Sequence, residues 1–134
     1  MRLALCIAVL AIAAGSAVGA TPTAKTTPGG TLRAEIAAFN AKNFRAAYAA
    51  YTARFKARCS YVTFSKHMAK QLAMVPAPIA VRIKSSRITG ARATLTYDIL
   101  LGGQAVSSVT AASPDAFARV NGLWYDDIDA QTPC

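Results

Sequence analysis

The sequence is poor in the residues on which most metal and proton-transfer sites depend. Its 134 residues include one His, three Cys and six Asp or Glu, and only 16% are charged. One His cannot supply several metal ligands, and three Cys are too few for a small disulfide-rich scaffold. The shortage of acids excludes an acidic disordered chain, and the composition excludes a polytopic membrane protein. We therefore expect neither a metal nor another cofactor.

Apolar and basic residues are abundant instead. Hydrophobic residues make up 54% of the chain, and 15 Lys and Arg give a formal net charge of +9. The length suits one domain around a single core. The charge is uneven, since 13 basic residues lie between Lys25 and Arg92 with Glu35 as the only acid, whereas from Ala93 onward Arg119 stands against five Asp.

The first twenty residues have the pattern of an export signal. Arg2 precedes an uncharged apolar stretch of twelve residues, 3–14, which suits a signal peptide and is short for a membrane span. Small or β-branched residues at 18–20 predict cleavage between Ala20 and Thr21. We expect residues 1–20 to be a signal peptide and the protein to be secreted or extracytoplasmic, without a membrane span after cleavage. An uncleaved N-terminal anchor is the alternative.

Two cysteines, Cys59 and Cys134, would remain after cleavage. An exported protein meets oxidising conditions, in which an even pair of cysteines is typical of a disulfide. We expect one bridge between them. The alternative is two unpaired thiols, with Cys59 buried and Cys134 at a frayed end.

The rest of the chain divides into a tail and a folded domain. Residues 21–30 (TPTAKTTPGG) have four Thr, two Pro and two Gly without apolar periodicity, which predicts a flexible tail. From residue 31 the apolar period is helical, and we expect a single α+β domain over 31–134. Thr31, Asn43 and Ser60 are the predicted N-caps of three helices, the second carrying aromatic residues from Phe44 to Phe55.

Beyond Pro78 the apolar residues alternate with a period of two. This alternation over 79–83 and 93–101 predicts a first hairpin, and Gly102–Gly103 and Asn121–Gly122 indicate two further hairpin turns. Helices followed by a meander of antiparallel strands predict an α+β fold. We expect three N-terminal helices packed on a curved antiparallel sheet.

Two stretches of the strand region carry a family resemblance. Residues 93–106 (ATLTYDILLGGQAV) are similar to a stretch of the actinobacterial low-molecular-weight secreted antigens, which share a signal peptide, a Gly-x-Trp turn and a Cys near the end. With the three helices and the last hairpin, 119–125 (RVNGLWY), the chain resembles the nuclear-transport-factor-two-like (cystatin-like) cone fold. The resemblance implies a cone-shaped domain and an extracytoplasmic location. It implies no reaction, because this fold hosts enzymes and binding proteins alike.

The basic residues indicate an anionic partner. Pairs at helical i, i+4 spacing could form basic stripes, and a second set follows on the first hairpin. An exported basic face would meet anionic polymers or phospholipid headgroups of the cell envelope, and nucleic acid is not an expected partner. A merely solubilising surface is the alternative. The residues of the expected basic face are Arg54, Arg58, Lys66, Lys70, Arg82 and Lys84.

Aromatic residues are candidates for a pocket, because a cone-shaped domain often leaves an opening between sheet and helices. Tyrosine hydroxyls would be its polar groups and other aromatic rings its apolar walls. Such a pocket would take a small apolar molecule, and ordinary core packing is the alternative. The candidates are Tyr48, Tyr51, Phe55, Tyr61, Tyr97 and Trp124.

An isomerase- or dehydratase-like enzyme would need a carboxylate base facing a hydrogen-bond donor in a dry pocket. Asp98 is the only mid-strand carboxylate, and alternation points it away from Tyr97 and toward solvent. We expect His67 on a helix surface, and Asp126, Asp127 and Asp129 in a polar tail that closes the last strand. We therefore expect no catalytic residue and interpret the protein as an exported, non-catalytic binding domain, with homodimer formation through the open sheet face as an option.

Overall fold

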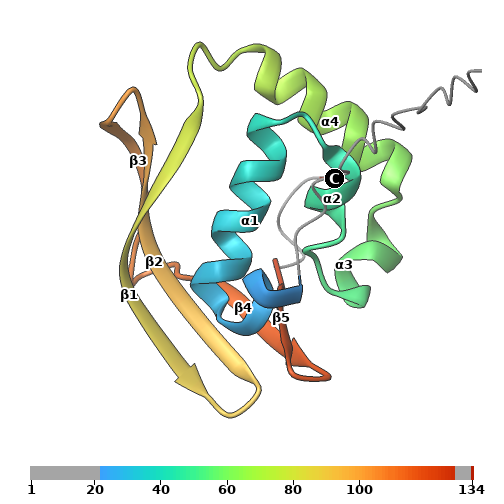
Figure 1. Cartoon of the computed structure of the whole chain (residues 1–134), viewed down its shortest axis with the longest axis vertical. Coiled ribbons are helices and arrows are strands. Elements are labelled where there is room, and N and C mark those ends of the chain that lie inside the picture. Colours follow the sequence, from blue (N-terminus) through green and yellow to red (C-terminus); the bar gives the residue numbers. More distant parts are fainter. Residues whose placement is uncertain (1–21, 129–133) are drawn as a thin grey trace, which may run out of the picture.

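The computed structural model describes residues 22–128 and Cys134, so that the predicted signal peptide and Asp129 lie outside the described residues. A 3-10 helix η1 (Pro22–Thr26) precedes α1 (Pro28–Asn40), α2 (Phe44–Tyr48), α3 (Ala53–Arg58) and α4 (Tyr61–Ala73). The strands are β1 (Ile79–Thr89), β2 (Arg92–Leu101), β3 (Gln104–Val109), β4 (Asp115–Val120) and β5 (Leu123–Asp126). In Figure 1 the helices lie on one side of the sheet, and α1 stands between the sheet and α2–α4. Within 22–128, no helix is long and apolar enough to cross a membrane.

The strand β2 is the centre of a five-stranded antiparallel sheet. It pairs with β1 on one side and, on the other, with β4 through its first half and with β3 through its second. β5 continues the sheet beyond β4. Register shifts between Ile83 and Ser85 in β1 and between Ile99 and Leu100 in β2 increase the local twist. The expected α+β class, with helices on a curved antiparallel sheet, is confirmed (Figure 1).

The predicted hairpin turns are also confirmed. Gly102 and Gly103, between β2 and β3, have φ of 56° and 81°. Asn121 and Gly122, between β4 and β5, have φ of 51° and 81°. Two successive positive φ values are typical of the type I′ turn, whose twist matches that of the flanking strands.

The first helix begins earlier than predicted. Thr27, not Thr31, is its N-cap, and the Thr27 hydroxyl accepts a hydrogen bond from the backbone N–H of Gly30 at 3.0 Å. Pro28 follows at the first helical position, where its fixed φ suits a helix. Thr31 is fully buried inside α1 and donates its hydroxyl to the carbonyl of Trp124 at 3.0 Å, which ties the helix to β5.

The expected flexible tail is therefore wrong for residues 22–30, which form η1 and the first turn of α1. Lys25 is buried, with its Nζ donating to the carbonyl of Ala49 at 2.8 Å and lying 4.5 Å from the ring centroid of Tyr125. A Cβ on Gly30 would come within 2.1 Å of the Ala24 carbonyl oxygen. The backbone of η1 can therefore pack closely on α1 only because residue 30 has no side chain. In this run, Thr27 caps α1, Pro28 begins it and Gly30 allows the close contact with η1.

The predicted second helix is two helices, which makes four α-helices in the described chain instead of three. Thr52 is the N-cap of α3 and accepts from the backbone N–H of Phe55. Residues between α2 and α3 pair instead with the end of β5. The Thr52 N–H donates to the Asp126 carbonyl at 2.9 Å, and the Asp126 N–H donates to the Ala50 carbonyl at 2.8 Å. A backbone requirement far along the sequence thus interrupts a regular aromatic period.

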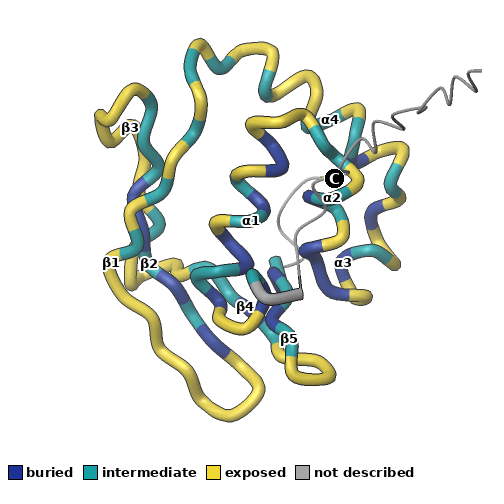
Figure 2. Tube along the Cα trace, viewed as in Figure 1, coloured by how far each residue is buried: buried dark blue, intermediate teal, exposed yellow. Residues whose placement is uncertain are grey.

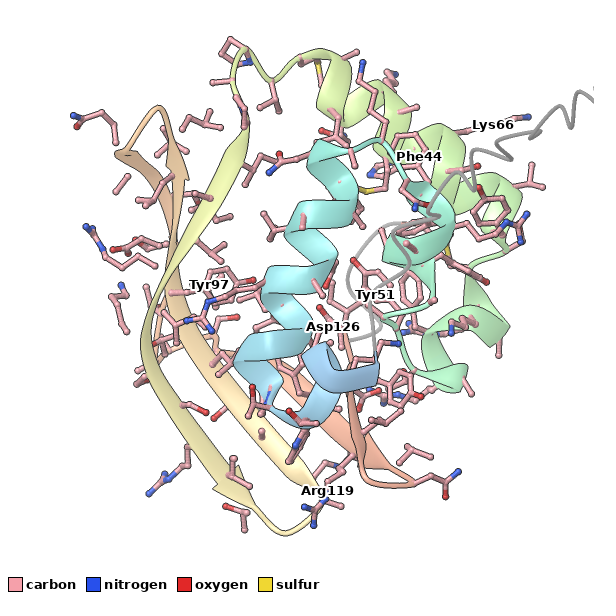
Figure 3. The ribbon with its side chains drawn as sticks, viewed as in Figure 1. Phe44, Tyr51, Lys66, Tyr97, Arg119 and Asp126 are labelled. Atoms are coloured by element: carbon pink, nitrogen blue, oxygen red, sulfur yellow. A yellow bond between two sulfur atoms is a disulfide. The ribbon has the colours of Figure 1, made fainter. Side chains whose placement is uncertain are left out.

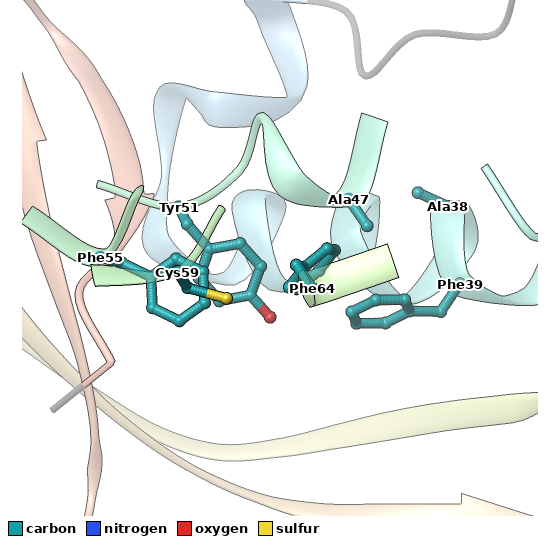
Figure 4. Close-up of a cluster of buried hydrophobic side chains, with 7 residues drawn as sticks. All are labelled: Ala38, Phe39, Ala47, Tyr51, Phe55, Cys59 and Phe64. Carbon is teal, nitrogen blue, oxygen red and sulfur yellow. The ribbon is translucent and has the colours of Figure 1, made fainter. Parts of the chain in front are cut away.

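The core has two parts, one on each side of α1, along which buried positions recur (Figure 2). The helix-side cluster, drawn in Figure 4, lies among α1–α4, and the sheet-side cluster lies between α1 and the strands. Ile36 packs against both. The helix-side cluster comprises Ala38, Phe39, Ala47, Tyr51, Phe55, Cys59 and Phe64; the sheet-side cluster comprises Leu32, Ala93, Leu95, Tyr97, Phe117 and Trp124.

Candidate functional site

The predicted disulfide is present in the structure. Cys59 at the end of α3 is bonded to Cys134, and their Cα atoms are 5.5 Å apart. Cys59 is 1% exposed and belongs to the helix-side cluster. The bridge thus ties residue 134 to the aromatic part of the core.

The structure divides the expected pocket aromatics between the two clusters. Tyr48, Tyr51, Phe55 and Tyr61 pack on the helix side, where Tyr51 stacks on Phe55 with ring centroids 4.4 Å apart. The Tyr48 hydroxyl donates to the carbonyl of Cys59 at 2.6 Å. Tyr97 and Trp124 lie on the sheet side. These rings pack in the two parts of the core, and two of them, Tyr51 and Phe55, also line the apolar cavity described below.

Two of the tyrosines reach a group of buried acids that the sequence analysis did not identify. We call this the acid–tyrosine cluster: Glu35, Tyr51, Tyr97, Asp115 and Asp126. Tyr51 donates its hydroxyl to Glu35 Oε1, and Tyr97 donates to Asp115 Oδ2 at 2.8 Å. Glu35 is 4% exposed and Asp126 is 2% exposed. In Figure 3, Tyr51, Tyr97 and Asp126 lie in the interior around α1, whereas Lys66 and Arg119 lie at the periphery.

Burial raises the pKa of each of these acids. It raises the pKa of Glu35 from 4.5 to about 7, assisted by the negative charge of Asp115 and opposed by the hydrogen bond from Tyr51. Burial also raises the pKa of Asp126 well above its ordinary value, with the charges of Glu35 and Asp115 adding to the effect. Glu35 and Asp126 are close enough to share a proton in a hydrogen bond. Without that proton, Glu35 Oε2 and Asp126 Oδ1 have no partner in the described chain.

Two sequence signals could have found this cluster. Glu35 is three residues after Leu32 and four before Phe39, which puts it on the buried face of α1. Asp126 is two residues after Trp124, so strand alternation puts both on the core side of β5. Asp126 and Asp127 are predicted in a polar tail that closes the last strand. Asp126 does end β5, but both residues are buried, so the prediction of a polar tail is wrong.

Asp127 is held by three side chains, two from the start of α3 and one from β2. Its Oδ1 accepts from the Thr52 hydroxyl at 2.9 Å and from Arg54 Nε at 3.2 Å. Its Oδ2 is paired with Arg92 of β2. Asp127 thus joins the start of α3 to the sheet, and two of the cations counted in the basic regions serve as its counter-ions.

Asp98 lies on the outer face of the sheet, opposite Tyr97, as alternation predicts. It is not freely solvated, however: the residue is 8% exposed because neighbouring side chains cover it. Lys84 and Arg82 each pair with it at 2.9 Å, and Ser108 donates to it at 2.7 Å. The hydrogen bonds from Lys84, Ser108 and Arg82 hold the pKa of Asp98 well below its usual range. An acid in this state is a weak base, and it faces away from the core.

The candidate basic residues fall on two separate surfaces. Arg82 and Lys84 lie with Asp98 on the outer face of the sheet, where they are partly neutralised. The other four lie on α3 and α4, on the opposite side of the molecule (Figure 1). Of these, Arg54 pairs with Asp127 and Arg58 donates to the carbonyl of Ile128, at 3.2 Å. Lys66 and Lys70 are exposed and form no ion pair within the described residues.

The exposed Lys, Arg, Asp and Glu side chains of the described chain are all basic. Fourteen of the 15 Lys and Arg lie in it, and all are exposed except buried Lys25 and half-buried Lys56. Five of the six Asp and Glu lie in it, and none is exposed: Asp115 is half-buried, and Glu35, Asp98, Asp126 and Asp127 are buried.

An apolar cavity of about 210 Å³ lies on the helix side, beside the disulfide. His67, expected on a helix surface, is half-buried and forms part of its wall. A second cavity, of about 220 Å³, lies between the ends of α1 and α4 and the start of β1, and a third, of about 260 Å³, lies beside Lys56 and Tyr125. Neither Glu35 nor Asp126 lines any of these three cavities. The first is lined by Phe39, Tyr51, Phe55, Cys59, Phe64, His67, Met68, Ile128 and Cys134.

Comparisons with known proteins bear on the fold alone. No protein-family model matches the chain, and no curated protein matches its sequence. Among solved structures, the chain is similar to the solution structure of a SEC-C motif containing protein from Rhodopseudomonas palustris. The two are 17% identical, each is covered over 77% of its length, and the TM-score is 0.57. The resemblance to the cone-fold secreted antigens therefore stays a prediction.

Proposed function

We propose that the protein is an exported, non-catalytic binding domain that docks on anionic components of the cell envelope. The observation that carries this proposal is the segregation of charge. Twelve Lys and Arg side chains are exposed in the described chain, whereas each of its five carboxylates is buried or half-buried. The sequence pattern of residues 1–20 and the disulfide between Cys59 and Cys134 support export.

The cations best placed for docking are Lys66 and Lys70. They lie one turn apart on α4 and form no ion pair with a carboxylate of the described chain, unlike Arg54 and Arg82. Exposed cations without nearby acids create a positive field that attracts polyanions and anionic headgroups. Near an anionic membrane surface, each such residue contributes about 1 kcal/mol, and added salt screens the attraction.

The positions of the acids favour binding over catalysis. Asp98, the candidate base of an isomerase-like enzyme, is held ionised by Arg82, Lys84 and Ser108 on the outer face of the sheet. Glu35 and Asp126 are closed off in the core. The Asp98→Asn variant gives the direct test of the enzymatic alternative, which requires loss of turnover with an unchanged fold.

Binding to lipid vesicles tests the docking proposal. We expect the mature protein to sediment with phosphatidylglycerol-containing vesicles at low salt, to be released as salt rises, and to ignore pure phosphatidylcholine vesicles. Lys66→Gln/Lys70→Gln should weaken binding more than the matched double variant Arg82→Gln/Lys84→Gln, which removes the same formal charge from the outer face of the sheet. Salt-independent binding, or no binding to anionic vesicles and to soluble polyphosphate alike, would overturn the proposal.

A homodimer remains a separate prediction. The outer face of β1 and β2 through which it would form is polar where Arg82, Lys84 and Asp98 meet. Light scattering of the purified protein over a range of concentrations tests it directly.

A further inference from the structure

The apolar cavity on the helix side has the size of a ligand site. Its volume of about 210 Å³ exceeds the roughly 150 Å³ of an apolar protein cavity that takes up benzene. Three phenylalanines, a methionine and an isoleucine form most of its wall, and the Cys59–Cys134 bridge lies beside them. Such a surface offers dispersion contacts to a hydrocarbon and few partners to water.

The wall of this cavity reaches the surface of the protein. His67, Met68 and Ile128 are half-buried, whereas Phe55 and Phe64 at the back are 4% exposed. A chain-like molecule could thus enter beside α4 and lie against the aromatic rings. The cavity lies among the helices, away from the space between α1 and the sheet, which the sheet-side cluster fills.

The rim of the cavity is cationic. Arg58 donates Nη2 to the carbonyl of the wall residue Ile128 at 3.2 Å, which places a guanidinium at this edge. Lys70 follows His67 by three residues on α4, so the two side chains are neighbours on the helix surface. Asp127, next to Ile128 in sequence, is 3% exposed and its carboxylate is taken up by Arg54 and Arg92.

We propose that this cavity binds the hydrocarbon chain of a small anionic amphiphile, a medium-chain carboxylate or the equivalent part of an anionic lipid, with the anionic group beside Arg58, His67 and Lys70. The apolar wall takes the chain, and the cationic rim selects the charge of the headgroup. The site shares Lys70 with the docking surface, but its apolar wall is separate from that surface, so binding of the hydrocarbon chain does not depend on the docking proposal. Free ligand and lipid carry the same chemistry, so the test includes both.

Three probes with the same eight-carbon chain separate the two parts of the site. We expect octanoate to bind the mature, oxidised protein with a Kd on the order of 0.1 mM, measured by calorimetry, with 1-octanol weaker and octylammonium weakest. Tighter binding of octylammonium than of octanoate, or no binding of any of the three probes, would overturn the proposal. Octanoate competing for the protein against anionic vesicles would identify lipid as a source of the chain; additive binding would identify free carboxylates.

A matched pair of variants on α4 tests the location. Met68→Trp fills the cavity and should weaken octanoate binding about tenfold or more, since it removes most of the space for the chain. Leu72→Trp adds the same ring one turn further along, at a residue that lines the second cavity instead, and should leave octanoate binding within about twofold. Thermal unfolding of both variants checks the fold. If both variants weaken octanoate binding equally, or if neither weakens it, the assignment is contradicted, whatever the result with vesicles.

Discussion

Asp98 and Asp126 are both almost inaccessible to solvent, at 8% and 2% exposure, yet the structure treats their charges in opposite ways. On the outer face of the sheet, Lys84, Arg82 and Ser108 surround Asp98 and lower its pKa. In the interior, Asp126 has Glu35 and Asp115 for neighbours, and its pKa is raised. The comparison teaches that lost accessibility does not determine ionisation. What decides it is whether the groups that cover the acid are cations and hydrogen-bond donors or other acids and hydrocarbon.

This difference makes the formal net charge of +9 an underestimate near neutral pH. That number counts every carboxylate as ionised, whereas burial raises the pKa of Glu35 to about 7 and that of Asp126 well above its ordinary value. The protein is therefore more cationic in its folded state than its composition indicates. Docking on an anionic surface would benefit from this, and acidification would strengthen it.

The largest effect should come from Glu35→Gln, which removes the interior charge and keeps the shape. The folded protein has a raised pKa of about 7 at Glu35 against 4.5 when unfolded, so the associated stability is present below pH 4.5 and is lost as the pH rises to 7. This loss amounts to about 3 kcal/mol of the free energy of unfolding. Urea titrations from pH 4 to 8 should show the free energy of unfolding of the wild type falling with pH. For Glu35→Gln the fall should be smaller by about 3 kcal/mol. Parallel curves for the two proteins would contradict a raised pKa.

A smaller effect is expected when the cations around a buried acid are removed. Arg54→Gln/Arg92→Gln leaves Asp127 buried with Thr52 as its remaining side-chain partner. We expect a loss of about 2 kcal/mol in the free energy of unfolding at pH 7, below the usual figure for a broken buried pair because both arginines are largely exposed. Adding Asp127→Asn should recover part of the loss, and no recovery would show that the arginines act through packing.

Tyr51→Phe should have an effect of about 1 kcal/mol, the size of one buried hydrogen bond. The Tyr51 hydroxyl lowers the pKa of Glu35, so its removal should raise that pKa above about 7. A ¹³C NMR titration of the Glu35 carboxyl measures the change directly. Tyr48→Phe is the control, since its hydroxyl bonds the Cys59 carbonyl and no acid. A Glu35 pKa that falls in Tyr51→Phe would exclude the hydrogen bond.

The smallest effect is expected for Asp98→Asn. The lowered pKa of Asp98 means that its stabilisation is present above its ordinary value of 3.8 and is lost as the pH falls through the lower folded value. The variant should therefore melt slightly below the wild type at pH 7, with the gap closing in strong acid. High salt should narrow the gap as well, because Arg82 and Lys84 are solvent-exposed. A gap that widens on acidification would refute the lowered pKa.

Local sequence signals predicted the fold class well and the site poorly. The turns at Gly102–Gly103 and Asn121–Gly122 and the caps Asn43 and Ser60 follow from the chemistry of single residues. The break between α2 and α3 depends on backbone hydrogen bonds with Asp126, which no local period reveals.

The ionisation of the buried acids also could not be predicted from local sequence patterns. Periodicity places Glu35 and Asp126 on buried faces, but whether a buried acid is ionised depends on which groups the fold brings to it. Tyr97 reaches Asp115 because β2 pairs with β4, which puts Leu95, two residues before Tyr97, opposite Asp115. The cavity beside the disulfide is harder still to predict from the sequence, because it is formed where the packing of Phe55, Phe64 and Met68 leaves space.

Gly30 has a consequence for how this chain can be altered near its N-terminal end. A single methyl group at position 30 would displace the backbone of η1, because the space is occupied by the Ala24 carbonyl. Lys25, the one buried lysine among residues 22–128, would leave its place against Tyr125 and become exposed. The absence of a Cβ at Gly30 thus keeps the Lys25 amine buried, and we expect Gly30→Ala to make this amine accessible to chemical labelling.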